Sequence, residues 1–239
     1  MGKRIIAQRR GSGSPKYRKP SFNSKAQASY APLPINAEAE GIVKEIFRCP
    51  AHSSPIAAVS INGKLVHHIA PEGISVGQRL KYASTDEEAK TGNVLPLKDI
   101  PDGSSVFNIE LIPGDGGKLV RASGTSARII SKSEKGVIIE LPSKKEKRLD
   151  PKCRATIGVA AGGGRLDKPI LKAGKMYYIS KSKHELFPKV SGAKMNAFDH
   201  PFGNKRSSRK SKARPVSRHA PPGRKVGYIS PKRTGRKKK

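Results

Sequence analysis

The stretch "SVFNIEL" (residues 105–111) shows the pattern on which the fold class depends. Apolar side chains recur at every second position from Phe107 to Leu111. Asn108 and Glu110 stand between them. Because side chains alternate between the two faces of a strand, this period of two predicts a strand with one face on a core. The other face is expected to meet solvent or a partner.

Further short apolar runs, separated by Gly and Pro, predict more strands on both sides of this stretch. They span residues 41–47, 56–61, 64–70, 79–83, 126–131, 136–141, 153–160 and 175–180. Asn62–Gly63 joins two of these runs directly, and both residues tolerate the positive φ of a tight type I′ hairpin. The stretch "SEKG" (133–136) predicts a second hairpin with a longer loop. Only residues 84–90 have a helix start signal, because Thr85 and Glu88 can form a capping box.

The close spacing of the strands predicts a mostly β protein with one or two small barrels or sandwiches. The acidic segment 85–93 is the expected joint between them. A first unit would cover about 37–88 and a second about 89–188. Each unit is small, so each would bury a modest core.

The positive charge of the chain is concentrated at its two ends. The whole chain has 49 Lys and Arg against 18 Asp and Glu, a net charge of +31. Residues 1–36 contribute +8 and residues 189–239 contribute +16. These ends have few aliphatic residues, so alone they should be disordered. Such charge predicts a polyanionic partner, first of all nucleic acid, because neutralised phosphates release counterions. No amphipathic or long apolar stretch supports the rival partner, an anionic membrane.

The first residues contain no apolar core of the kind that a signal peptide needs. Cys49 and Cys153 are too few for a disulfide framework and too isolated for a zinc site. We therefore expect free thiols in a reducing compartment, with a cytoplasmic location.

Two glycine-rich stretches are candidates for phosphate-binding loops. "PGDGGK" (113–118) lacks the spacing of a nucleotide-binding loop, and its glycines predict close approach of another backbone, such as RNA. "AAGGGR" (160–165) precedes a proline-containing segment that disfavours a helix. For that stretch a flexible turn and an RNA-approach loop stay equally open.

Three histidines, His67, His68 and His200, are candidates for catalytic or metal-binding groups. Asp199 and His200 are adjacent, but Pro201 favours an extended backbone at His200, where neighbouring side chains point apart. Asp199 is the only acid in residues 189–239. It could be a counter-charge to Lys or Arg, a cap on a turn, or a ligand of RNA-bound Mg²⁺. His67 and His68 should face opposite sides of a strand, with surface or sheet-face roles.

At the C-terminal end the sequence resembles a known family. The stretches "MNAFDHPFG" (195–203) and "VSRHAPPGRKVGYISPKRTGR" (216–236) resemble the universal large-subunit ribosomal protein L-two family, in its archaeal or eukaryotic-cytosolic form. Residues 9–18, 92–130 and 153–165 are similar to other signatures of the family, in the same order. The resemblance covers nearly the whole chain.

The resemblance implies an OB-like barrel over 37–88 and an SH3-like barrel over 89–188, with basic extensions over 1–36 and 189–239. It implies a structural, non-enzymatic role in the large ribosomal subunit. There the chain would bind rRNA and neighbouring proteins, support assembly and association with the small subunit, and lie near the peptidyl-transferase centre. We expect no cofactor, with Mg²⁺ present only through bound rRNA, no membrane and no small-molecule substrate.

Residues expected to contact rRNA are the exposed cations of the ends and loops, together with two residues of the matching tail motif. His200 is expected to lie near the peptidyl-transferase centre as an RNA contact and not as a catalyst. The full set is Arg9, Arg10, Lys16, Arg18, Lys19, Lys118, Arg121, Arg154, Arg165, Lys194, Asn196, His200, Lys205, Arg206, Arg218, Arg224, Lys225, Arg233 and Arg236.

Aromatic residues and bends add to this expectation. Pro221–Pro222–Gly223 should form a stiff bend that presents Arg224 and Lys225. Five aromatic side chains of the two ends could stack on unpaired bases: Tyr17, Phe22, Phe198, Phe202 and Tyr228. Phe198 and Phe202 could equally pack as small hydrophobic contacts against the barrels.

The sequence departs from the family pattern after Gly203, where Asn204 and Lys205 replace further glycines. Asn tolerates the left-handed conformation, so the turn can survive, but the contacts of residues 204–215 stay open. Two other functions also stay open: an RNA-acting enzyme that uses Asp199 and His200, and a DNA-packaging protein.

Overall fold

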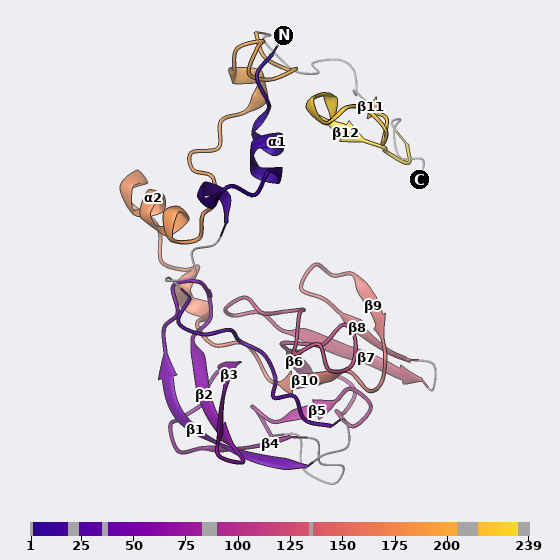
Figure 1. The fold of residues 1–239 in the computed structure, drawn as a ribbon. Helices are drawn as coiled ribbons and strands as arrows, with labels where there is room; N and C mark the ends of the chain where they lie inside the picture. The colour runs from indigo at the N-terminus through magenta and orange to yellow at the C-terminus, as the bar shows by residue number, and fades with distance from the viewer. Residues whose placement is uncertain are drawn as a thin grey trace. The chain divides into compact units, whose positions relative to one another are not determined.

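The computed structural model describes residues 2–18, 24–34, 38–82, 90–133, 136–204 and 215–233. The chain divides into two compact units (Figure 1). We call residues 1–20 and 172–239 the tail unit, and residues 21–171 the sheet unit. The helical turn expected at 84–90 lies almost wholly outside the described residues, so that prediction stays untested.

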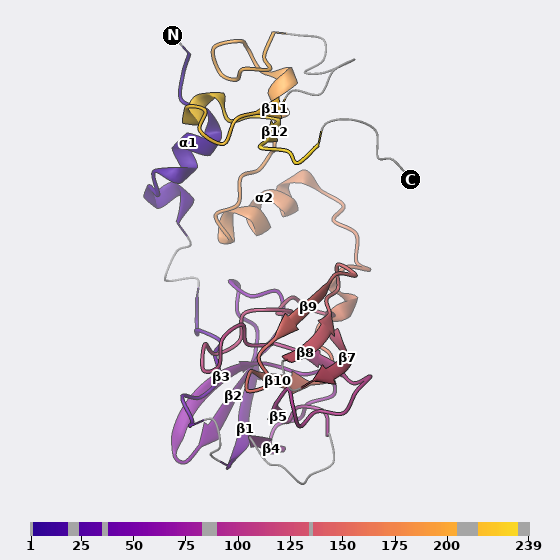
Figure 2. The ribbon, with the colours of Figure 1, turned by 90° about the vertical axis from the view of Figure 1, so that its right-hand side faces the viewer.

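The described part of the sheet unit is built from one ten-stranded sheet (Figures 1 and 2). Its spatial order is β3-β2-β1-β4-β5-β10-β6-β7-β8-β9. All neighbouring strands are antiparallel except β4 and β5, which are parallel where Tyr82 pairs with Val94. The mostly β prediction is confirmed. The strands are β1 (Ala39–Phe47), β2 (Ile56–Ile61), β3 (Lys64–Ile69), β4 (Arg79–Tyr82), β5 (Val94–Pro96), β6 (Ser105–Phe107), β7 (Ala127–Ser133), β8 (Gly136–Glu140), β9 (Glu146–Leu149) and β10 (Arg154–Ile157).

Both predicted hairpins are present. Asn62 (φ 48°) and Gly63 (φ 76°) join β2 to β3, and Ile61 pairs with Lys64 across the turn. Positive φ at both central residues is the requirement of the predicted type I′ turn. The second hairpin joins β7 to β8, with Ser133 opposite Gly136. Its loop has two residues, so the prediction of a longer loop was wrong.

Two main clusters of buried side chains lie along the sheet. One belongs to the first strands and includes Val43, Val59 and Leu80. The other contains Ile129 and Ile139 of the later strands. A smaller third cluster takes side chains from both regions, including Ile56 of β2 and Phe107 of β6.

The stretch 105–111 departs from the expected alternation. Strand β6 covers only its first three residues, and every side chain from Val106 to Glu110 is fully buried. Val106 packs in the cluster of the later strands, while Phe107 packs in the third cluster. The side expected to meet solvent or a partner is buried within the chain itself, because Glu110 is enclosed by Arg154 and by the N–H groups of Gly114 and Gly116.

Residues 24–34, part of the expected N-terminal extension, pack into the sheet unit. The Ser29 N–H donates to the His67 carbonyl at 2.9 Å, and the Tyr30 N–H donates to the Gly116 carbonyl at 3.1 Å. The buried Tyr30 hydroxyl lies 2.7 Å from Thr156 Oγ1 and donates to the Asn108 carbonyl at 2.6 Å. This segment is therefore anchored by hydrogen bonds to residues far along the chain.

His68 lies on the core-facing side of β3, so of the two expected roles, surface or sheet face, it has the sheet-face one. Its ring is 5.5 Å from the rings of Tyr30 and Tyr82, measured between centroids, and it is 4% exposed. His67, on the other side of β3, has an edge contact with Phe47. Burial lowers the pKa of His68 to about 3, with smaller contributions from the charges of Arg154 and His67.

We expect this buried histidine to make the unfolding free energy fall as the pH drops below about 6.5. The unfolded chain binds a proton at His68 below that pH, whereas the folded chain does so only near 3. The stabilisation is therefore complete above the unfolded pKa and is lost as the pH falls toward the folded pKa. Between pH 6.5 and 5 the loss should be roughly 1–2 kcal/mol.

Denaturant unfolding at several pH values measures this effect. His68→Gln, which cannot be protonated and can still hydrogen-bond Tyr82, should show a flatter pH profile. Equal profiles for the two proteins would contradict the assignment.

The tail unit has little regular structure. Among the described residues its elements are α1 (Ile6–Gly11), α2 (Ala173–Ser182), β11 (Pro215–Val216), β12 (Tyr228–Ile229) and three single-turn 3₁₀ helices, Pro15–Tyr17, Gly192–Lys194 and Pro222–Arg224. A further 3₁₀ helix, Gly163–Arg165, lies in the sheet unit. Strands β11 and β12 pair in parallel. The strand predicted at 175–180 was wrong, because these residues form most of α2. An apolar run this short does not distinguish helix from strand.

Candidate nucleic-acid interface

The positive charge is concentrated in the tail unit, which has a larger net charge than the end segments 1–36 and 189–239 taken together. The tail unit has 28 Lys and Arg against two acids, Glu185 and Asp199, a net charge of +26. The sheet unit has 21 basic and 16 acidic residues, a net charge of +5. Repulsion within the tail unit is large unless an anion neutralises it, so this unit is the candidate interface.

The N-terminal arm contacts the tail motif directly. The Lys3 N–H donates to the Phe198 carbonyl at 2.7 Å, and the Lys3 ammonium lies 4.5 Å from the centre of the Phe198 ring. Ile5 is 5% exposed. Its N–H donates to Gln8 Oε1 at the start of α1. These contacts connect the first and last parts of the chain within one unit.

A compact turn surrounds His200. The N–H groups of Asp199 and His200 both donate to the Asn196 carbonyl, at 3.1 and 3.3 Å. The Gly203 N–H then donates to the His200 carbonyl at 2.8 Å, which closes a turn over Pro201. His200 therefore lies between two successive turns.

The side chains of Asp199 and His200 have different partners, so the structure shows no acid–base pair. Asp199 Oδ1 lies 3.9 Å from the Lys3 ammonium, which agrees with the counter-charge reading. His200 Nδ1 accepts a hydrogen bond from the Phe202 N–H at 3.0 Å. The imidazole packs against Gly192, where a Cβ would collide with the ring. Burial lowers the pKa of His200, so the neutral ring is favoured.

Asn204, where the sequence leaves the family pattern, has a φ of 56°. Its N–H donates to the Met195 carbonyl at 2.9 Å. The prediction that Asn preserves the turn by adopting the left-handed conformation is confirmed.

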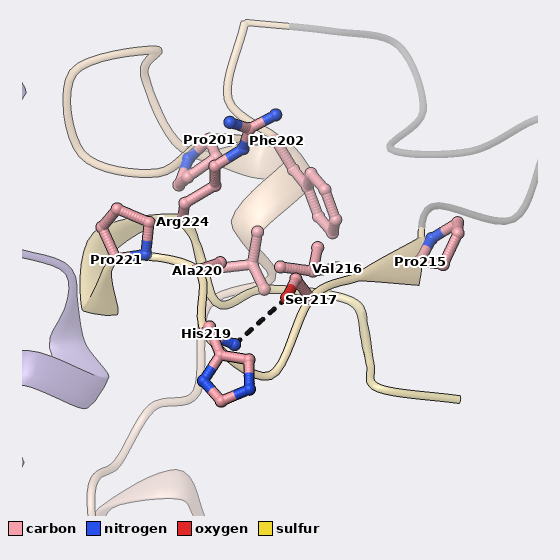
Figure 3. Close-up of a pocket in the computed structure, with 10 residues that line it drawn as sticks. Pro201, Phe202, Pro215, Val216, Ser217, His219, Ala220, Pro221 and Arg224 are labelled. Carbon is pink, nitrogen blue, oxygen red and sulfur yellow. Dashed lines mark hydrogen bonds between the residues drawn. The ribbon is translucent and has the colours of Figure 1, made fainter. Parts of the chain in front are cut away.

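A pocket of about 500 Å³ lies beside this turn (Figure 3). Pro201 and Phe202 line one side of it, and residues 215–226 line the rest. Figure 3 shows Phe202, Val216 and Ala220 facing one another, with the Arg224 guanidinium beside Pro201 and Phe202. The predicted bend at 221–223 is present as a 3₁₀ turn, Pro222–Arg224.

Most of the described residues expected to contact rRNA are exposed. Those in the tail unit are Arg9, Arg10, Lys16, Arg18, Lys194, Asn196, Arg218, Arg224 and Arg233, with Lys225 and His200 half-buried, and those in the sheet unit are Lys118 and Arg165. Four further residues lie outside the described part of the chain: Lys19, Lys205, Arg206 and Arg236.

Comparison with known proteins gives consistent results along the chain. Residues 90–220 match the family model for ribosomal proteins L2, C-terminal domain. The large ribosomal subunit protein uL2 of Methanococcoides burtonii is 48% identical over 238 residues, which cover 99% of this chain and all of the relative. The same protein of Methanococcus vannielii is 48% identical over 241 residues, with the same coverage.

The chain belongs to the ribosomal protein L2 family. The resemblance stated from the sequence is confirmed, including its archaeal character. The L2 family match spans the later strands of the sheet unit and continues into the tail unit as far as Ala220. In the part of the chain that the structure describes, no helix is long and apolar enough to cross a membrane.

Arg154, expected from the sequence to contact rRNA, has an internal role in this L2-family chain. Its side chain is 5% exposed, and its Nη2 lies 2.9 Å from Glu110 Oε1. Its Nε donates to the same oxygen and its Nη1 donates to the Ala31 carbonyl. These three bonds account for the guanidinium, so we withdraw Arg154 from the proposed interface.

Arg121 also has internal partners. Its Nη2 donates to the Ala28 carbonyl at 2.6 Å and its Nη1 to the Gly117 carbonyl at 3.1 Å. Burial lowers the pKa of the guanidinium, with opposing contributions from Tyr30 and Asp115. Arg121 connects the N-terminal segment to the glycine-rich loop, and its half-buried position leaves only part of it for a partner.

The glycines of "PGDGGK" (113–118) admit the chain's own backbone and side chains. A Cβ on Gly116 would lie 3.0 Å from Ser29 Cβ, and one on Gly117 would lie 2.5 Å from Asn108 Oδ1. Both glycines are buried, with positive φ. The close approach expected at this stretch is therefore made by the protein's own chain at Gly116 and Gly117, whereas a Cβ on Gly114 would meet nothing within 4 Å.

Sequence reasoning missed two exposed tyrosines. Tyr177 and Tyr178 are 47% and 70% exposed on α2, and their rings form an edge contact. Lys175 and Lys181 lie on the same helix, which has no acid in its first turn. Tyrosines among lysines are a signal for RNA stacking, but the apolar run at 175–180 also fits a strand, which hides the signal in the sequence.

Proposed function

We propose that this chain is a structural, non-enzymatic constituent of the large ribosomal subunit that binds large-subunit rRNA mainly through its tail unit. The observation that carries the proposal is the net charge of +26 in that unit. Lys and Arg bind phosphates and fix register, with little sequence information. Membership of the ribosomal protein L2 family favours rRNA over other polyanions.

We further propose that the chain contains an OB-like barrel over 37–88 followed by an SH3-like barrel over 89–188, whose last residues, 172–188, belong to the tail unit. The two main buried clusters support this division, since one is formed largely by the first strands and the other by the later ones. The compact units themselves break at residues 20/21 and 171/172, and not at the ends of the proposed extensions.

Finer roles follow from the family resemblance and are part of the same proposal. The chain would support assembly of the large subunit and its association with the small one, and would contact neighbouring proteins. His200 would lie near the peptidyl-transferase centre. Its lowered pKa and its bond from the Phe202 N–H suit a neutral RNA-contacting imidazole. Because Nδ1 accepts that hydrogen bond, the proton of the neutral ring lies on Nε2, so neither ring nitrogen offers a free lone pair for a general base.

Binding of large-subunit rRNA should depend steeply on salt. If about ten phosphates are neutralised, log affinity should fall against log salt with a slope of roughly −7 to −9, because each contact releases counterions. A filter-binding or fluorescence titration at several salt concentrations measures the slope. Sedimentation of cell lysate should show the chain travelling with large subunits.

A salt-independent interaction, or absence from the large-subunit fraction, would refute the proposal. The DNA-packaging alternative is tested in the same titration. Duplex DNA should compete less well than structured ribosomal RNA, because the proposed site follows RNA shape and unpaired bases. Equal competition by both nucleic acids would favour the alternative.

A further inference from the structure

The pocket in Figure 3 has mixed apolar and polar walls inside a strongly cationic unit. Its apolar part contains proline rings and the half-buried Phe202, Val216 and Ala220, its polar part contains Ser217, His219 and Arg224, and the lining has no acidic residue. The nearby Asp199 lies against Lys3. Arg224 is the charged residue of the lining, and its guanidinium lies beside Pro201 and Phe202. A partly apolar, partly aromatic cavity with one cation at its edge therefore faces a partner expected to be polyanionic.

Backbone groups around the pocket are already hydrogen-bonded. The Ala220 N–H donates to the Ser217 carbonyl, and the Arg224 N–H donates to the Pro221 carbonyl. The Val216 carbonyl accepts from the Ser230 N–H at 2.8 Å. A peptide that bound as an added strand would need free backbone donors and acceptors. Recognition at this pocket must therefore come mainly from side chains: from flat apolar contacts, from the Arg224 guanidinium and from the polar groups of Ser217 and His219.

We propose that this pocket accepts one unpaired RNA nucleotide, whose base packs between Phe202 and the Val216–Ala220 side while Arg224 contacts its phosphate. The volume of about 500 Å³ is that of pockets that hold small organic ligands, so one extruded base fits. Aromatic side chains bind unpaired bases by stacking in a sequence-tolerant way. The inference rests on the proposed rRNA binding and adds a defined base-binding site to it.

The test uses the full-length chain and two short RNA hairpins. One hairpin is fully paired, and the other carries a single bulged 4-thiouridine. Affinity is measured for both, and the crosslinked peptide is identified by mass spectrometry. Ala220→Trp fills the pocket and Phe202→Leu removes the aromatic ring, while Phe202→Trp keeps one. Val190→Trp is the matched control, because Val190 is an exposed apolar residue of the same unit outside the pocket lining.

The wild type, Phe202→Trp and Val190→Trp should bind the bulged hairpin about tenfold more tightly than the paired one, as expected for one stacked base. The crosslink should map to residues 201–203 or 215–226. Ala220→Trp and Phe202→Leu should lose most of this preference. All the variants should keep the salt slope of the wild type, since none alters the charge.

The proposal is overturned if the pocket variants keep the preference for the bulge, or if the crosslink maps elsewhere. In either case a normal salt slope with large-subunit rRNA would leave the proposed function standing. A wild-type chain without affinity for either RNA would overturn both. Loss of preference in Val190→Trp as well would assign the effect to the added ring and not to the pocket.

Discussion

Replacing Glu110 by Ala should lower the free energy of unfolding by about 3–5 kcal/mol, the usual cost of leaving one member of a buried ion pair alone. Glu110 is fully buried. Its Oε1 accepts from Arg154 Nη2 at 2.9 Å and from the Gly116 N–H at 3.2 Å. Its Oε2 accepts from the N–H groups of Arg154 and Gly114. Removal would leave a buried guanidinium and two loop N–H groups without this acceptor.

Urea unfolding of the two proteins measures this loss. Asp102→Ala is the matched control, because Asp102 is an exposed carboxylate of the same unit, and its loss should lie within about 0.5 kcal/mol. The double variant Glu110→Met, Arg154→Met should recover part of the stability, since it removes the unpaired charge. Recovery should stay incomplete, because the loop N–H groups still lack their acceptor. A loss for Glu110→Ala equal to that of the control would contradict this account.

Deleting residues 172–239 should reduce affinity for large-subunit rRNA by a factor of about 10³ or more at low salt, because most phosphate contacts are expected there. The deleted segment has 21 Lys and Arg and two acids. The break between the compact units lies at its start. The slope of log affinity against log salt should become shallower by roughly 0.7–0.9 for each phosphate that the truncated chain no longer neutralises.

The sheet unit should remain folded after this deletion, since the described partners of its buried residues lie within 21–171. Circular dichroism and denaturant unfolding provide that control. A shorter deletion of 189–239 should leave subunits that fail late in assembly or activity. Unchanged rRNA affinity of the truncated chain, or normal subunits in cells with the shorter deletion, would contradict the assignment of the interface.

Most strands were predictable because their signals are local. The runs at 41–47, 56–61 and 64–70 correspond to β1, β2 and β3 with shifts of no more than two residues. The Asn62–Gly63 turn was predictable because few residue pairs accept positive φ at both positions. Strands β5 and β9 were not predicted. Strand β5 has only three residues, and β9 has the mostly charged sequence "EKRL", which lacks an apolar run.

The site was predictable in its chemistry but not residue by residue. Charge and the tail motif indicated the C-terminal end, and Asn204 was rightly assigned a left-handed conformation. Nothing in the sequence distinguishes Arg154 from the other basic residues, yet its side chain is buried in a salt bridge with Glu110. The pairing spans 44 positions, and no local pattern reports a contact over that separation.

The sequence alone determined that this protein is mostly β, belongs to the ribosomal L2 family and needs a polyanion. Strand periodicity, net charge and ordered motifs are properties of short segments, so they can be read without a fold. Only the tertiary structure decided which cations stay exposed, which glycines face the chain itself and where a pocket forms beside Phe202. These depend on burial and on partners distant along the chain, and both exist only once the chain has folded.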